Sequence, residues 1–192
     1  MKKIKEEICN IGKRLYERGF VASHDGNISV RTEKGILVTP TLTSKGFMNV
    51  DDIVLIDYCN NILEGGKKQS SEAKLHIEVY KNRPDIMAIV HSHSPFACAF
   101  AINRKPVNQR YMPEAINSLG VIPVAEYAEP STEKLAKSIE PFVKNHNGVL
   151  LANHGSVTWA KTLLDAYNLT EQLEFYCKTV IFADILGNPI SI

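Results

Sequence analysis

The sequence predicts a layered α/β or α+β domain in which helices pack on one central sheet. Segments with helical periodicity alternate with short strand-like segments from one end of the chain to the other. Apolar residues make up 44% and charged residues 22% of the chain, an ordinary globular balance that argues against disorder and coiled coil. The 192 residues fit a single domain over 1–192, and no repeat or Pro/Gly-rich linker divides them.

The N-terminal part is predicted to contain a long helix followed by a hairpin. Apolar residues recur at spacings of three and four over residues 2–19, which is typical of an amphipathic helix, and Gly19 is a stop signal. The triplet Glu33-Lys34-Gly35 predicts a hairpin turn, and Asn60-Asn61 a later turn. The predicted strands of this part are 27–32, 35–39 and 53–56.

The remaining chain is predicted to alternate helices and strands up to a long closing helix. Ser70 or Ser71 is expected to cap a helix that runs to about Asn82, and Pro84 lies beyond its end. Gly187 is expected to end the closing helix. The predicted helices after Pro84 are 96–101, 132–143 and 162–186, and the strands are 86–90, 122–125, 149–152 and 157–160.

Charge and composition exclude several classes of function. Lys and Arg total 22 and Asp and Glu 21, so no overall field attracts nucleic acid, although a few local groups suffice for one phosphate. No apolar run approaches the roughly 20 residues of a membrane span, and Met1–Asn10 lacks a secretory core. We therefore expect a cytoplasmic protein without a membrane partner. Four scattered cysteines indicate neither a thiolate zinc site nor a disulfide framework.

Three of the six histidines lie at predicted strand ends. His91 and His93 follow the strand 86–90, and residues two apart in an extended chain point to the same face. His154 follows the strand 149–152, and adjacent strands that end together would bring it to the first two. Three imidazoles with a free fourth position are typical of a catalytic zinc site. His-x-His alone is a weak motif, since two histidines at a strand end are often surface or hydrogen-bonded groups.

A second group of polar residues suggests an anion site. Ser70 and Ser71 precede the helix, where free N–H groups and hydroxyls can bind an anion. Glu72 is either a helix-charge partner, the simpler interpretation, or a general acid/base or transient ligand beside the metal. Asn27 and Thr41 are ordinary turn residues taken singly, but with the serines they could form a phosphate pocket. Lys45 could add charge, although a lone lysine is usually solvated.

Five of these segments also resemble a known family. They are Gly26–Arg31, Leu37–Thr41, Ser70–Glu72, Ala88–His93 and Leu151–Gly155. In this order and at these spacings they resemble the class II aldolase/adducin family, closest to the L-fuculose-1-phosphate aldolases. The resemblance extends from about residue 4 to 187. It implies an αβα sandwich, that is, a mainly antiparallel central sheet with helices on both faces. It also implies a homotetramer with active sites at subunit interfaces.

The resemblance also implies a role for each candidate site residue. The metal, zinc or another divalent ion, would be bound by His91, His93 and His154. Glu72 would be the acid/base, and Tyr111 would reach a neighbouring subunit's site as a proton donor. The residues that match phosphate-binding positions are Asn27, Thr41, Ser70 and Ser71. One departure affects the phosphate loop, because Leu42 stands where the family usually has glycine.

The function implied is that of a zinc-dependent aldolase. It would reversibly cleave a ketose 1-phosphate to dihydroxyacetone phosphate and an aldehyde through a metal-stabilised enediolate. Sugar-acid-phosphate decarboxylase, methylthioribulose-phosphate dehydratase and ribulose-phosphate 4-epimerase are alternatives within the family, but the epimerases typically have Asp in place of Glu72. An adducin-like interaction domain without catalysis is an alternative of another class, and the retained histidines argue against it. The sugar, its phosphorylation and the native metal are left open.

Overall fold

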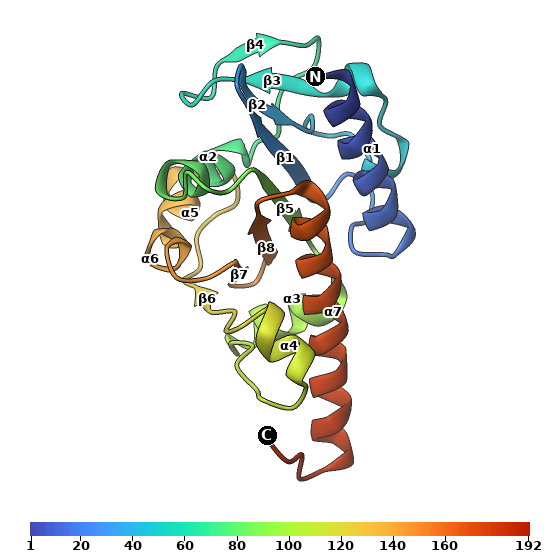
Figure 1. Cartoon of the computed structure of the whole chain (residues 1–192), viewed down its shortest axis with the longest axis vertical. Helices are drawn as coiled ribbons and strands as arrows, with labels where there is room; N and C mark the ends of the chain where they lie inside the picture. The colour runs from blue at the N-terminus through green and yellow to red at the C-terminus, as the bar shows by residue number, and fades with distance from the viewer.

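The computed structural model describes the whole chain, residues 1–192, and one sheet of eight strands runs through it (Figure 1). The strands are β1 (Asn27–Thr32), β2 (Gly35–Val38), β3 (Val54–Ile56), β4 (Ile62–Glu64), β5 (Ala88–Ser92), β6 (Val124–Ala125), β7 (Gly148–Leu151) and β8 (Gly155–Ala160). Their order in the sheet is β4-β3-β2-β1-β5-β8-β7-β6. All neighbours are antiparallel except β6 and β7. The predicted mainly antiparallel sheet is therefore confirmed.

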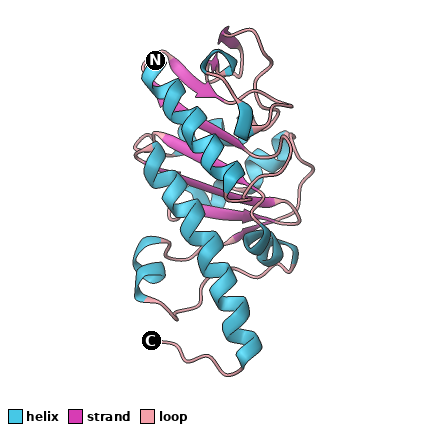
Figure 2. Cartoon of the chain, turned by 90° about the vertical axis from the view of Figure 1, so that its right-hand side faces the viewer, coloured by secondary structure: helices cyan, strands magenta, loops and turns pink.

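Helices cover both faces of this sheet. The α-helices are α1 (Lys2–Glu17), α2 (Ala73–Asn82), α3 (Pro95–Ile102), α4 (Pro113–Ser118), α5 (Glu133–Ser138), α6 (Glu140–Val143) and α7 (Leu163–Leu186). Helices α2, α5 and α6 share a hydrophobic cluster with one face, and α1, α3, α4 and α7 share two clusters with the other. Figure 2 shows α1 and α7 running over the same side of the sheet. The αβα sandwich is thus confirmed, and none of the helices has the length and apolar character needed to cross a membrane.

The two faces of the sheet arise from alternation along the strands. Ile36 and Val38 of β2 belong to the cluster under α2, whereas Leu37 between them packs under α1. Successive side chains of a strand point to opposite faces, so an apolar strand supplies both cores. The same rule places Ile28 of β1 under α1 and leaves Asn27 to face α2, where it bonds Glu72.

Some predicted boundaries differ from the structure. Helix α2 begins at Ala73 with Glu72 at its N-cap position, and Ser70 accepts a hydrogen bond from the Glu72 N–H at 3.2 Å instead of capping the helix itself. The predicted helix 132–143 is divided into α5 and α6 near Pro141, which cannot donate a backbone hydrogen bond. Strand β4 and helix α4 were not predicted. The three residues of β4 are exposed, and the six residues of α4 are too few to show a helical period.

Candidate metal centre

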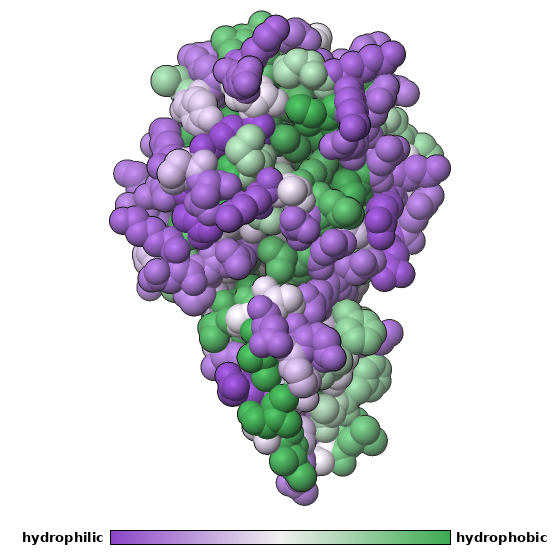
Figure 3. Space-filling view, in the orientation of Figure 1, coloured by the Kyte–Doolittle hydropathy of each residue, from purple (hydrophilic) through white to green (hydrophobic).

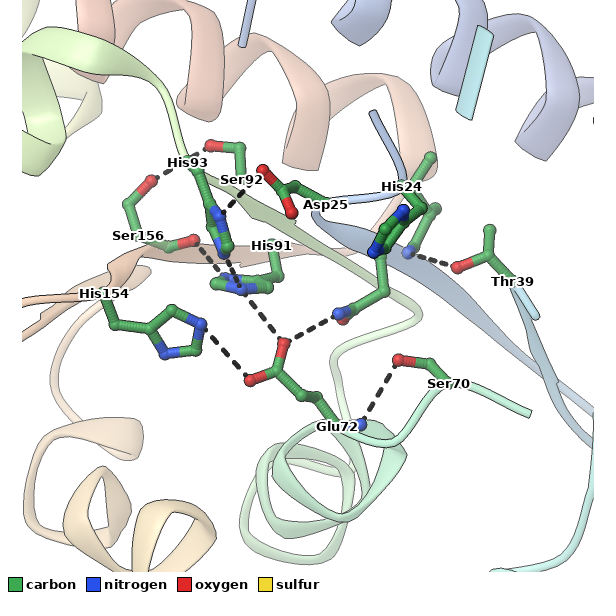
Figure 4. Close-up of polar contacts among 12 residues, drawn as sticks. His24, Asp25, Thr39, Ser70, Glu72, His91, Ser92, His93, His154 and Ser156 are labelled. Atoms are coloured by element: carbon green, nitrogen blue, oxygen red, sulfur yellow. Dashed lines mark hydrogen bonds and ion pairs between the residues drawn. The ribbon is translucent and has the colours of Figure 1, made fainter. Parts of the chain in front are cut away.

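Three imidazole rings converge at one end of the central strands (Figure 4). His91 lies within β5, His93 lies just beyond its end, and His154 lies in the turn between β7 and β8. Their ring centroids are 4.8, 4.8 and 4.9 Å apart, with planes inclined at 67° to 71° to one another. One nitrogen of each ring lies within 4.8 Å of the others. This nearly symmetric arrangement can hold one metal ion.

The pairing of β8 explains why these histidines meet. Strand β8 is antiparallel to both β5 and β7, so the β7–β8 turn lies beside the end of β5. A side chain at Gly155 would place its Cβ 2.9 Å from His93 Cδ2 and 3.2 Å from His91 Cε1. Glycine directly after His154 therefore lets the three rings approach closely. Asn153, directly before His154, has a φ of 56°, a left-handed conformation that asparagine tolerates.

The hydrogen bonds of His91 test whether a cation fits between the rings. His91 Nδ1 lies 2.9 Å from the Ser156 carbonyl oxygen, which can only accept, so Nδ1 carries the proton. In the neutral ring, Nε2 then has a lone pair, yet it lies 3.0 Å from His93 Nε2 and 3.1 Å from a Glu72 oxygen. Two nitrogens on one tetrahedral zinc ion are about 3.3 Å apart. A cation shared by these electron-rich atoms fits the arrangement, and the Ser156 carbonyl would orient the ligand ring.

Glu72 places its carboxylate against the same rings. Glu72 Oε2 lies 3.1 Å from His91 Nε2 and accepts a hydrogen bond from Asn27 Nδ2 at 2.9 Å. Glu72 Oε1 lies 3.4 Å from His154 Nε2. Burial by itself would raise the pKa of Glu72, but His91, His154 and the Asn27 amide lower it well below its usual value. The carboxylate is therefore ionised, and it can act as a base or a metal ligand.

The other two rings are held neutral. Burial, together with repulsion by His91, lowers the pKa of His93 to about 3 and that of His154 to about 4. Burial also lowers the pKa of His91, but the neighbouring Glu72 carboxylate outweighs burial and raises it overall. Neutral imidazoles are the form that binds a metal. Glu72 and a metal ion would consequently compete for His91.

A ladder of polar contacts between β1 and α2 fixes the position of Glu72. Asn27 bonds the Glu72 carboxylate, and two residues further along β1 the Ser29 hydroxyl contacts His76 Nδ1 at 2.7 Å and the Tyr80 hydroxyl at 2.8 Å. Positions 72, 76 and 80 follow one another by single helical turns, so they lie on one face of α2. Two residues along β1 cover nearly the same distance as one turn along the helix, so these contacts form together only when α2 packs on the sheet in one register.

A cavity of about 360 Å³ opens beside the histidines and Glu72. The four residues expected from the sequence to bind phosphate all line it. Its lining comprises His24, Asp25, Gly26, Asn27, Pro40, Thr41, Leu42, Lys45, Ser70, Ser71, Glu72, His93, Pro130, Ser131 and His154. Hydroxyl and amide groups therefore surround the same space as two of the three histidines, although these segments lie far apart in the sequence.

Leu42 has a backbone conformation that glycine would favour. Leu42 has a φ of 51°, in the left-handed region, and its side chain is 76% exposed. The loop is joined to the segment before α2, because Thr41 N donates to the Lys68 carbonyl and Ser70 N to the Thr39 carbonyl, both at 3.0 Å. Leucine at this position therefore adopts a left-handed backbone conformation that is strained for a residue with a Cβ.

Tyr111 lies apart from this cavity within the chain. It precedes α4, where its backbone N–H donates to the Tyr176 hydroxyl at 3.2 Å, and it packs against the cluster of α3, α4 and α7. It is not among the residues that line the cavity. Its action at a neighbouring subunit's site stays a prediction.

Sequence reasoning missed three groups at the site. Asp25 Oδ2 lies 3.6 Å from His93 Nδ1, and its place beside Gly26-Asn27 was a signal that could have identified it. The Ser156 carbonyl orients His91, but a backbone carbonyl has no signature in a sequence. Ser131 reaches the cavity from the segment before α5, and nothing in its local sequence indicates that.

Comparison with known proteins shows which sequences and folds this chain is similar to. Residues 6–181 match the family described as Class II Aldolase and Adducin N-terminal domain. An L-fuculose phosphate aldolase of Methanococcus vannielii is 36% identical over 90% of this chain and 91% of its own. A 3-oxo-tetronate 4-phosphate decarboxylase of Haemophilus influenzae is also 36% identical, over 97% and 90%. The solved structure of an L-fuculose 1-phosphate aldolase has a TM-score of 0.94 at 31% identity, covering 100% of this chain and 91% of that one.

Proposed function

Because the chain belongs to the class II aldolase and adducin family, we propose that it is a metal-dependent lyase that acts on a small phosphorylated sugar. The observation that carries the proposal is the convergence of three histidines and an ionised glutamate on a polar cavity. An interaction domain without catalysis would have no need for neutral imidazoles and a buried carboxylate at one point.

The two kinds of relative named above carry out closely related chemistry. A ketose 1-phosphate cleaved between its third and fourth carbons gives dihydroxyacetone phosphate and an aldehyde. A 3-oxo-tetronate 4-phosphate that loses its carboxylate as carbon dioxide and takes up one proton also leaves dihydroxyacetone phosphate. In both reactions the bond that breaks lies one carbon away from a ketone, between its α and β carbons, so we propose that one site of this design can serve either. We favour the aldolase, and the equal identity to the decarboxylase makes that enzyme the second candidate.

We assign the residues of the chain to the following tasks. His91, His93 and His154 would hold a divalent ion, which we propose is zinc. When bound, the ion supplies Lewis-acid stabilisation of negative charge on the substrate's oxygens. Glu72 moves the proton at the carbon beside the ketone. The residues that would bind and orient the phosphate are Asn27, Thr41, Ser70 and Ser71.

The leaving group distinguishes the aldolase from the decarboxylase. Aldol cleavage requires that the hydroxyl of the departing aldehyde lose its proton, whereas carbon dioxide departs without such a transfer. We propose that Tyr111 of a neighbouring subunit carries that proton in the aldolase reaction. The decarboxylase alternative needs no group at this position.

One screen separates these functions. The zinc-loaded protein is expected to release dihydroxyacetone phosphate from L-fuculose 1-phosphate or a related ketose 1-phosphate, and a chelator should abolish the release until zinc is returned. A coupled assay for dihydroxyacetone phosphate measures both substrate classes. Release from 3-oxo-tetronate 4-phosphate alone would establish the decarboxylase instead. Turnover of neither class would reject the lyase proposal.

An exposed apolar surface supports assembly of several subunits. Figure 3 shows apolar side chains gathered on the tapered end of the molecule, where Figure 1 places α4 and the end of α7. The exposed apolar residues of α7 and the C-terminal segment include Phe175, Phe182, Ile185, Leu186, Ile190 and Ile192. The C-terminal segment lies against the loop that carries Tyr111, since Ile192 N donates to the Arg110 carbonyl at 2.8 Å. We propose a homotetramer that buries this surface and brings Tyr111 to a neighbouring site.

Mixed assemblies test this arrangement. Glu72→Gln and Tyr111→Phe proteins are each expected to have little aldolase activity. When the two are co-expressed and mix at random, about one quarter of the sites should combine an intact Glu72 with an intact Tyr111 from the neighbour. Activity should therefore return to about a quarter of the wild-type value, measured per site. If tetramers that contain equal amounts of the two variants regained no activity, the sharing of the site between subunits would be contradicted.

A further inference from the structure

The lining of the cavity includes a buried lysine, which is not one of the four residues expected from the sequence to bind phosphate. Lys45 is 1% exposed, and it is the only lysine or arginine among the lining residues. The sequence favoured an ordinary solvated lysine, and the structure corrects that interpretation. Burial of an ammonium group is costly unless hydrogen bonds and an opposite charge compensate it.

Two backbone carbonyls hold the ammonium between the loops that form the cavity. Lys45 Nζ donates to the His24 carbonyl at 2.9 Å and to the Thr43 carbonyl at 2.6 Å. The first carbonyl precedes Asn27, and the second follows Thr41, so the ammonium joins both loops of the expected phosphate pocket. An ammonium has three N–H donors, and these two bonds leave one donor for a further acceptor.

The charge of Lys45 is compensated only in part by the protein. No carboxylate lies within 4.0 Å of its Nζ. Burial lowers the pKa of Lys45 to about 8, against the opposing influence of Asp25 at longer range. Carbonyl groups satisfy hydrogen bonds but carry no net negative charge. An anion in the cavity would supply what is missing.

We propose that Lys45 binds the anionic end of the substrate, directing its third donor and its charge at a phosphate monoester. The neutral hydrogen-bonding groups of Asn27, Thr41, Ser70 and Ser71 line the same cavity and suit the remaining phosphate oxygens. A neutral hydroxymethyl group could use those hydroxyls, but it would leave the ammonium uncompensated. This inference rests on the proposed function and makes Lys45 the residue that selects the phosphorylated form of the sugar.

Titration of inorganic phosphate into the metal-loaded protein tests the charge directly. Lys45→Gln keeps N–H donors for the loop carbonyls but removes the charge. It is expected to weaken phosphate binding by roughly 10- to 100-fold, as for the loss of a charged hydrogen bond. Lys68→Gln removes an exposed lysine from the adjoining segment and should leave the affinity unchanged. Wild-type affinity in folded Lys45→Gln protein would overturn the inference.

A crystal structure of the wild-type protein with inorganic phosphate provides a test that needs no variant to fold. A phosphate oxygen is expected within about 3 Å of Lys45 Nζ. A phosphate bound in the cavity away from Nζ would overturn the inference, even if Lys45→Gln proved too unstable to purify.

The role of Lys45 and the proposed lyase function can be refuted separately. Phosphate binding that depends on Lys45, without release of dihydroxyacetone phosphate from either substrate class, would support the inference and reject the lyase. Release of dihydroxyacetone phosphate with an unchanged KM in the Lys45→Gln variant would support the lyase and reject the inference.

Discussion

Replacement of Glu72 by glutamine is expected to lower turnover by about 10²- to 10⁴-fold, the usual contribution of a general acid–base group. Glutamine is nearly the same size, and it can still accept a hydrogen bond from Asn27, but it cannot take up a proton. Three histidines remain to hold the ion, so the fold and most of the metal should be retained. Exchange of solvent deuterium into dihydroxyacetone phosphate measures the lost step directly.

A second buried glutamate provides the matched control for this variant. Glu174 lies outside the cavity, where its carboxylate accepts hydrogen bonds from Phe96 N and Ala97 N. Glu174→Gln should leave deuterium exchange unchanged. If Glu72 were only a charge at the start of α2, its replacement would cost under about 1 kcal/mol of stability and leave turnover intact. A near-normal rate in folded, metal-loaded Glu72→Gln protein would therefore place the chemistry on another residue.

Replacement of His93 by alanine is expected to remove most of the bound metal and, with it, the activity. The change deletes one of three imidazole ligands, and even loss of a group that merely supports a ligand typically costs 10- to 100-fold in metal affinity. The loss here should exceed about 100-fold. Metal content per chain after dialysis, measured by elemental analysis, gives the result without reference to activity.

His146→Ala is the control for the metal measurement. The His146 ring lies away from the triad and contacts the Val121 carbonyl through Nδ1 at 2.9 Å. Metal content should be unaffected by this change, and circular dichroism should show both variants folded. Full metal occupancy in His93→Ala protein would refute the assignment of the three histidines to one ion.

Local sequence patterns predicted most of the elements that build this fold. The apolar periodicity of α1 and the hairpin signal Glu33-Lys34-Gly35 between β1 and β2 arise within a few residues, so a single chain is enough to identify them. Strand β4 was missed because no local pattern identifies it. β4 consists of exposed residues without a buried face, and its existence depends on pairing with β3 rather than on its own sequence.

The residue types of the site were visible in the sequence, but their convergence was not. His91 and His93 share a strand end and could be paired from their spacing alone. Their approach to His154 depends on the pairing of β8 with β5, which joins segments more than sixty residues apart. The contact of Asn27 with Glu72 likewise requires that α2 pack on β1 in one register.

By itself, the sequence determined a layered domain of helices around one sheet and the residues able to hold a metal, because periodicity and ligand chemistry are local properties. The αβα sandwich was expected from the resemblance to the family and not from periodicity. Only the tertiary structure decided that Lys45 is buried and that Leu42 keeps a left-handed backbone. It also showed that Tyr111 does not line the cavity of its own chain, whereas its place at a neighbouring subunit's site was expected from the resemblance and stays a prediction. Burial and proximity depend on which distant segments pack together, and that information resides in long-range contacts rather than in any short stretch of residues.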